Sequence, residues 1–237
     1  STHSKTKNTL LAPAAFALGV AVKHFNVLLA PVFSFQQKKP GRKILFLVLP
    51  PLLFLSLFIP YWADRAYVAK EVFGYSLGAG YWGWSGILCR VFLFVTQIDL
   101  TQMPWFHGSR FFNPAFYLGI LALSYFWAHK YDLLDWIVFV FLTFYVFTTQ
   151  MAPQYTVWII PFAVLRRNIF FYLYSAIGAI QLGFFYYCHY FWEKHIPMTG
   201  TGASMSKAFV IARYLTWAVC VLLWVSMVKK NDKIPAR

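Results

Sequence analysis

The chain has 237 residues, of which 60% are hydrophobic and 22% aromatic, whereas only 12% carry a charge. This composition excludes an ordinary water-soluble domain, in which about a quarter of the residues are charged, and the mean hydropathy of +0.57 is typical of a chain with several apolar runs. The net charge of +14 would suggest nucleic acid for a soluble domain. In a membrane protein it indicates lipid phosphate and basic cytoplasmic loops instead, so membrane lipids are expected partners and nucleic acid is not.

The first apolar run extends from Leu10 to Phe35 and is interrupted near its middle by Lys23 and His24. It forms either one crossing or a hairpin of two half-helices that meet near these two residues. The basic loop Lys38 to Lys43 follows the run, and the positive-inside rule places such a loop in the cytoplasm. We favour the hairpin, because it keeps both ends of the run, each rich in lysine, on the cytoplasmic side.

The second run, Ile44 to Trp62, is predicted to cross outward with a kink at Pro50 and Pro51, since proline cannot donate a backbone hydrogen bond. Residues 63–114 then form one large exterior loop, whose first part is rich in glycine, Tyr and Trp. Within this loop the apolar segment Ile87 to Ile98 is too short to cross, so it is predicted to be an interfacial or re-entrant helix.

Five further apolar runs complete the predicted crossings, and they cover residues 115–128, 133–149, 155–165, 169–190 and 208–228. If each run crosses once, the basic gaps share the side of the Lys38 loop; these gaps contain Lys130, Arg166 with Arg167, and Lys229 with Lys230. The sequence therefore predicts an all-α, polytopic transmembrane bundle of about seven spans. Residues 1–237 would form a single integral membrane domain with a cytoplasmic C-terminus.

Lys23 is the first residue that could carry chemistry. A charged ammonium group about twelve residues from either end of an apolar run is costly unless it is paired or hydrated. Because the chain has only 7 acidic residues, the phosphate of a lipid carrier is a candidate partner. The alternative is a structural lysine at the interface of a tilted or broken helix.

The exterior loop supplies further candidates. The guanidinium groups of Arg90 and Arg110 have the geometry that binds phosphate oxygens, and the ring of Tyr75 is suited to stacking on a sugar. Scattered loop charges are also compatible with simple solvation, and the aromatic residues with an interfacial belt. The three cysteines show no metal-binding or redox spacing, so no metal site and no cofactor is expected.

The segment Gln150 to Pro161 is the most distinctive string of the chain. Pro153 cannot lie inside a regular helix, so Gln154 and Tyr155 are predicted to open a new helix at the exterior membrane face. Their amide and phenol groups suit carbohydrate hydroxyls. The same groups could instead serve the architecture by capping free backbone N–H groups.

Three segments resemble, in order and spacing, those of GT-C type polyprenyl-phosphate-dependent mannosyltransferases and their relatives. They are Ala17 to Pro31 with Lys23, the exterior segment Phe73 to Gly83, and Pro153 to Pro161. Asn26 stands at a position where that family usually has proline. The resemblance places Lys23, Tyr75, Gln154 and Tyr155 around an exterior cavity where the lipid-linked donor meets the acceptor.

The resemblance implies an inverting hexosyltransferase of the bacterial plasma membrane or the endoplasmic reticulum. Such an enzyme transfers a hexose such as mannose from a polyprenyl-phosphate sugar to a glycan or lipid-linked acceptor on the exterior or lumenal face. Its catalytic base lies in an exterior loop upstream of the matched segments, so we expect this chain to be the C-terminal part of a longer enzyme. The alternatives are a transporter or flippase for an anionic lipid or solute, and a scaffold subunit without catalysis.

Overall fold

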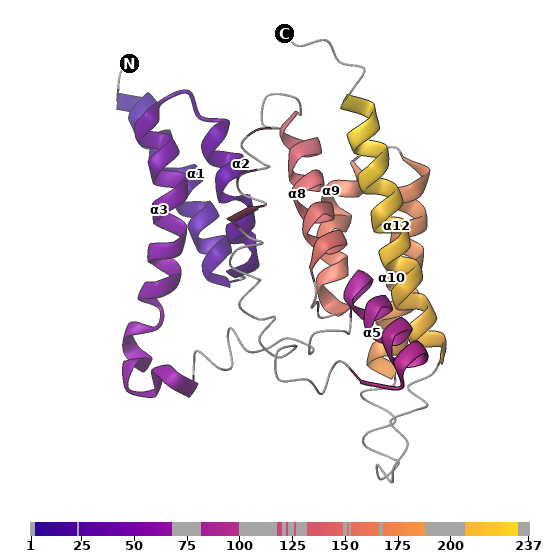
Figure 1. Ribbon diagram of the computed structural model, residues 1–237. Coiled ribbons are helices and arrows are strands. Elements are labelled where there is room, and N and C mark those ends of the chain that lie inside the picture. The colour runs from indigo at the N-terminus through magenta and orange to yellow at the C-terminus, as the bar shows by residue number, and fades with distance from the viewer. Residues whose placement is uncertain are drawn as a thin grey trace. The chain divides into compact units, whose positions relative to one another are not determined.

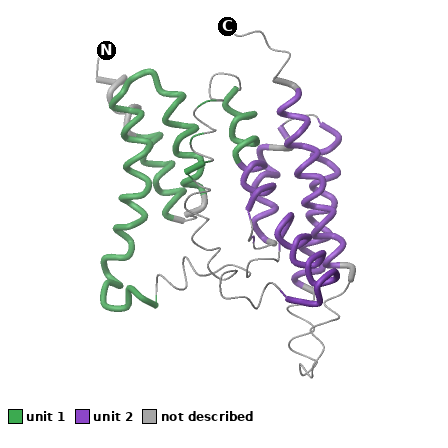
Figure 2. The backbone as a smooth tube through the Cα atoms, in the orientation of Figure 1, with its two compact units in different colours: residues 1–75, 115–140 green, residues 76–114, 141–237 purple. Residues whose placement is uncertain are grey.

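The computed structural model describes residues 3–22, 24–67, 82–99, 132–148, 151, 153–165, 168–187 and 207–231, with residues 118, 119, 122 and 126. Every regular element in these ranges is a helix, so the predicted all-α class is confirmed for the described part of the chain. The chain divides into two compact units (Figure 2). Unit 1 contains residues 1–75 and 115–140, and unit 2 contains residues 76–114 and 141–237.

Unit 1 begins with a hairpin. The helix α1 (His3–Val22) is followed by the short 3-10 helix η1 (His24–Leu29) and by α2 (Ala30–Phe35), which runs back alongside α1 (Figure 1). The rings of Phe16 and Phe33 are 4.8 Å apart between centroids, whereas 17 residues of straight helix would span about 25 Å. The hairpin is therefore confirmed, and a single straight crossing by residues 10–35 is wrong.

Asn26 closes this hairpin. Its Nδ2 donates a hydrogen bond of 3.1 Å to the carbonyl of Gly19. That carbonyl is one of the last four of α1, which have no partner within the helix itself. The Asn26 side chain therefore satisfies one of the carbonyls at the end of α1.

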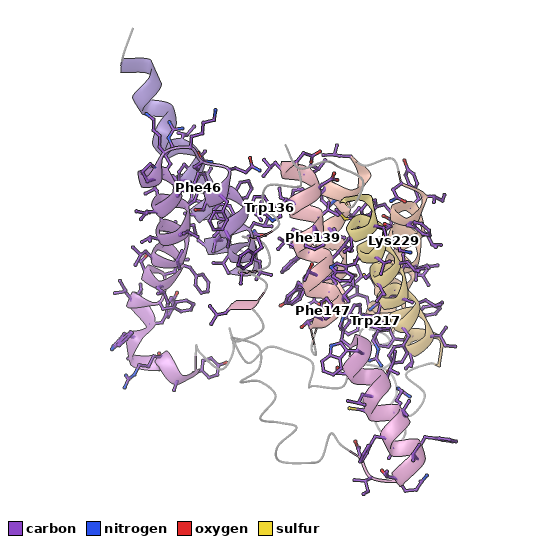
Figure 3. The ribbon with its side chains drawn as sticks, turned by 45° about the horizontal axis from the view of Figure 1, so that its top comes forward. Phe46, Trp136, Phe139, Phe147, Trp217 and Lys229 are labelled. Carbon is purple, nitrogen blue, oxygen red and sulfur yellow. The ribbon has the colours of Figure 1, made fainter. Side chains whose placement is uncertain are left out.

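The third helix of unit 1, α3 (Pro40–Ser56), packs against both α1 and α2. Phe46 of α3 (Figure 3) completes a cluster of three rings, with centroids 6.1 Å from Phe16 and 5.9 Å from Phe33. The helix runs on through Pro50 and Pro51, and a bend of 65° separates it from the segment Ile59–Tyr67, which begins with η2 (Ile59–Asp64).

Unit 2 is built around two long antiparallel helices, α10 (Ile169–Tyr187) and α12 (Lys207–Asn231), which lie side by side (Figure 1). The shorter elements of unit 2 are α5 (Gly83–Thr96), η5 (Pro153–Ile159) and α9 (Ile160–Val164). The helix α8 (Leu133–Phe147) is divided between the units after residue 140. Its side chains from Trp136 to Val146 are all buried, so it is an interior helix.

The described helices do not support about seven crossings. Two of them are long and apolar enough to cross a membrane, residues 169–186 of α10 and 209–229 of α12, and α3 with its bent continuation would make a third. The other predicted runs give shorter elements, because α8 has 15 residues and residues 153–164 are split between η5 and α9. Most of the run 115–128 lies outside the described residues. The short helix predicted within residues 63–114 is present as α5, which has 14 residues and starts at Gly83 rather than at Ile87.

Candidate functional site

The C-terminal end of α8 is saturated with hydrogen bonds. The indole Nε1 groups of Trp82, Trp217 and Trp84 donate to the carbonyls of Tyr145, Val146 and Phe147, at 2.7, 3.0 and 2.9 Å. The remaining carbonyl of the last turn, that of Phe144, accepts from the backbone N–H of Thr148 at 2.9 Å. All four carbonyls that a helix end leaves without an intrahelical partner are thus satisfied without water. Figure 3 labels Phe147, the last residue of α8, and Trp217, which lies within α12.

Gly83 allows this arrangement, because α5 starts in close contact with α12. Its φ is +53°, in the left-handed region that glycine adopts readily. A Cβ atom at this position would lie 2.6 Å from Nε1 and 2.7 Å from Cδ1 of Trp217. The glycine of the exterior motif therefore brings the first turn of α5 against the Trp217 indole.

The distinctive segment after α8 is held by two tyrosines. The hydroxyl of Tyr145 donates to the carbonyl of Tyr155, and the hydroxyl of Tyr174 donates to the carbonyl of Thr156, both at 2.5 Å. As predicted, a helix opens at Pro153, although it is the 3-10 helix η5. Gln154 and Tyr155 are half-buried, and the Tyr155 ring lies 4.4 Å from that of Trp158.

Arg90 lies on the exposed side of α5, two turns from its start, and contacts α12. Its Nε donates to the hydroxyl of Tyr214 at 3.1 Å, and its guanidinium lies 5.9 Å from the centre of the Tyr214 ring. The neighbouring Arg213, which is buried, donates from its NH2 group to the same hydroxyl at 3.3 Å. Two cations therefore meet at one phenol oxygen.

Three of the six predicted site residues are described, and all three belong to unit 2: Arg90, Gln154 and Tyr155. The structure joins their motifs through Tyr145, whose carbonyl accepts from Trp82 and whose hydroxyl donates to the Tyr155 carbonyl. The other three predicted residues lie outside the described residues, and they are Lys23, Tyr75 and Arg110.

Sequence reasoning missed the residues that hold these motifs together, above all Tyr145 and Trp217. Nothing in the pattern of an apolar run distinguishes them from lipid-facing aromatics. Arg213 gave only a weak signal in the sequence, because this charged residue is the sixth residue of the predicted run 208–228. The criterion that selected Lys23, a charge about twelve residues from either end of its run, does not select Arg213, because an arginine so near the end of a run can extend to the membrane surface.

Metal ions in proteins require a set of several ligating side chains, such as those of His, Cys, Asp and Glu. No group of three or more His, Cys, Asp or Glu side chains capable of holding a metal is found among the described residues. Cys89 of α5 is buried, and desolvation together with the Asp99 charge raises the pKa of its thiol. Such a thiol stays protonated at neutral pH and is a poor nucleophile.

Comparisons with protein-family models, with curated proteins and with solved structures give no match to this chain.

Proposed function

We propose that this chain is part of a multi-pass membrane glycosyltransferase of the GT-C type. It transfers a hexose such as mannose from a polyprenyl-phosphate sugar to a glycan or lipid-linked acceptor on the exterior or lumenal face. The observation that carries the proposal is the bridge made by Tyr145. It connects two segments that resemble this family, one containing Trp82 and the other Tyr155, although more than 70 residues separate them in sequence.

Further support comes from the hairpin in unit 1. The helix α1 ends at Val22 and η1 begins at His24, so two helix ends, and not one continuous helix, flank the sequence position of Lys23. Backbone groups at such ends add hydrogen-bond donors and acceptors to a polar site within the membrane. This is the environment in which a lysine and a lipid phosphate are least costly to bury.

The proposed reaction is a single inverting displacement. A carboxylate, which the resemblance places upstream of the matched segments, takes the proton of an acceptor hydroxyl. The hydroxyl oxygen attacks the anomeric carbon, and the bond between that carbon and the phosphate oxygen breaks. The phosphate oxygen leaves with the electron pair, and Lys23, Arg90 and Arg110 stabilise its charge. Tyr75, Gln154 and Tyr155 contact the sugar, and the reaction uses no metal or cofactor.

The proposal is tested by an assay of membranes that contain the whole gene product. Polyprenyl-phosphate sugars with a radiolabelled hexose are supplied, and transfer to endogenous acceptors is measured. We expect Lys23→Ala and Gln154→Ala each to lower transfer at least tenfold, since each removes a polar group that contacts the donor. Lys39→Ala and Gln36→Ala make the same changes at exposed positions on the cytoplasmic side and should leave transfer unchanged.

Full transfer by both site variants would refute the site assignment. Absence of transfer from every lipid-linked donor, with uptake or flipping of an anionic lipid by the same membranes, would identify a transporter instead.

A further inference from the structure

In the described part of unit 2, Arg90 and Arg213 bring two positive charges to the hydroxyl group of Tyr214. Both arginines donate to the Tyr214 hydroxyl, at 3.1 and 3.3 Å. A phenol oxygen has two lone pairs, and here both face cations, so its own proton is left to donate to a third group. The three side chains therefore offer only hydrogen-bond donors to a bound ligand.

Arg213 occupies an unusual place for a charged residue. It lies four residues inside the candidate span 209–229, about 6 Å along the axis from its end. Arginines near span ends usually extend to the membrane surface, but Arg213 is only 4% exposed. Its guanidinium is instead packed between rings, 5.9 Å from the centre of Phe209 and 4.9 Å from that of Tyr214. Because like charges repel in a medium of low polarity, an anion that binds both arginines would be strongly favoured.

Gln181 of α10 is a second, independent sign of a polar ligand. It is 0% exposed, and neither its Nε2 nor its Oε1 has a hydrogen-bond partner. Phe185 of α10 packs against Phe209 of α12, with ring centroids 6.0 Å apart. Gln181 lies four residues before Phe185 on α10, and Arg213 lies four residues after Phe209 on α12. Because the two helices are antiparallel, Gln181 and Arg213 lie at the same level along the helix pair. Buried amides are normally satisfied, so this one indicates a missing polar partner at the level of the two arginines.

We propose that Arg90, Arg213 and Tyr214 form a phosphate-binding site at this end of α12, with Gln181 at the same level inside the bundle. Guanidinium groups bind phosphate through paired, charge-assisted hydrogen bonds, and the phenol supplies one more donor. The phosphate is the headgroup of the polyprenyl carrier, and this identification rests on the proposed function. The site adds Arg213, Tyr214 and Gln181 to the residues that the sequence motifs indicated.

The test is direct binding by the purified whole protein in detergent. The probe is farnesyl phosphate, with farnesol as the uncharged counterpart and inorganic phosphate as the lipid-free one, and binding is followed by native mass spectrometry. We expect Arg90→Gln to weaken farnesyl phosphate binding about tenfold or more and Tyr214→Phe to weaken it several-fold. Farnesol should bind weakly to every variant. Inorganic phosphate should compete poorly, because it lacks the lipid chain.

The matched control is Arg65→Gln. Arg65 is also an exposed arginine beside an aromatic ring, 5.8 Å from the centre of Trp62, but it belongs to unit 1. Its replacement should leave binding unchanged. Because Arg213 is buried and its replacement could unfold the protein, the test depends on Arg90→Gln and Tyr214→Phe, whose thermal melting should match that of the unmodified protein.

Unchanged binding in both variants, or an equal loss in the Arg65 control, overturns the site. If inorganic phosphate competes strongly, and if Arg90→Gln and Tyr214→Phe no longer bind it, the ligand is a free phosphate and not the headgroup of a lipid. If these variants lose binding while no sugar donor supports transfer in membranes, the phosphate site stands and the proposed transferase function fails.

Discussion

Gly83 shows how much one residue decides in this protein. It combines a positive φ with a contact to Trp217 that leaves no room for a side chain. The residue is one of several glycines in the exterior loop, and its sequence position alone does not separate it from the others.

Replacement Gly83→Ala should destabilise unit 2. The added methyl group would displace the Trp217 indole and weaken its hydrogen bond to the Val146 carbonyl. We expect the free energy of unfolding to fall by about 1–3 kcal/mol, measured by denaturation of the purified protein in detergent. In the control Gly183→Ala, near the C-terminal end of α10, no atom lies within 4 Å of the new methyl group. That variant should be unchanged or more stable by up to about 1 kcal/mol. Equal losses in the two variants would contradict this account.

Asn26 makes a related point about unit 1. Its side chain ends α1 by donating to the Gly19 carbonyl, and this bond accompanies the reversal of the chain. The role could not be read from the sequence, where asparagine simply interrupts an apolar run.

At the scale of elements, the helix end of α8 is stabilised by indoles and not by a capping residue. Three tryptophans donate to its last carbonyls: Trp82 directly precedes α5, Trp84 belongs to α5, and Trp217 belongs to α12. The bond to the Tyr145 carbonyl is buried, and an unsatisfied carbonyl in such an environment costs several kcal/mol, on the order of 2 to 7. The tryptophans that the composition suggests as an interfacial belt are thus partly structural.

The variant Trp82→Phe should measure this effect. Trp82 is 0% exposed and donates to the Tyr145 carbonyl at 2.7 Å. Trp136, also 0% exposed, is a matched control because its Nε1 has no hydrogen-bond partner. Both changes remove the same atoms from a buried site, so their difference reports the hydrogen bond. We expect Trp82→Phe to lower the free energy of unfolding by about 1–3 kcal/mol more than Trp136→Phe, in denaturant titrations of the purified protein. A larger loss for Trp136→Phe would show that packing, and not the carbonyl bond, dominates.

For the whole molecule, the hairpin and the charge pattern make a joint prediction about topology. Both ends of residues 3–35 and the C-terminus should face the cytoplasm, since basic residues accumulate at all three. Cysteines introduced by Ser4→Cys, Gln36→Cys and Arg237→Cys, in a background without native cysteines, should react with an impermeant maleimide only from the cytoplasmic side.

The matched control for this labelling is Ile98→Cys, at an exposed position after α5, in the predicted exterior loop. It should react only from the outside. Labelling of Ser4→Cys and Gln36→Cys from opposite sides would contradict the hairpin, and exterior labelling of Arg237→Cys would contradict the predicted orientation.

The sequence by itself indicated an all-α membrane protein, because helices that cross a lipid bilayer require long apolar runs and few charged residues. It predicted the all-α fold, the long helices α10 and α12, the helix start at Pro153 and the hairpin at residues 23–24. Its count of about seven crossings is not supported by the described helices, of which two, or three with the bent continuation of α3, are long and apolar enough to cross. Hydropathy records neither the short length of α8 nor the division of residues 153–164 between η5 and α9. Only the tertiary structure decided which polar groups meet. Tyr145 is hydrogen-bonded to both Trp82 and Tyr155, which are 73 positions apart (155 − 82), and the Tyr214 hydroxyl accepts from both Arg90 and Arg213, which are 123 positions apart (213 − 90). Such contacts depend on helix packing, which no local sequence pattern records.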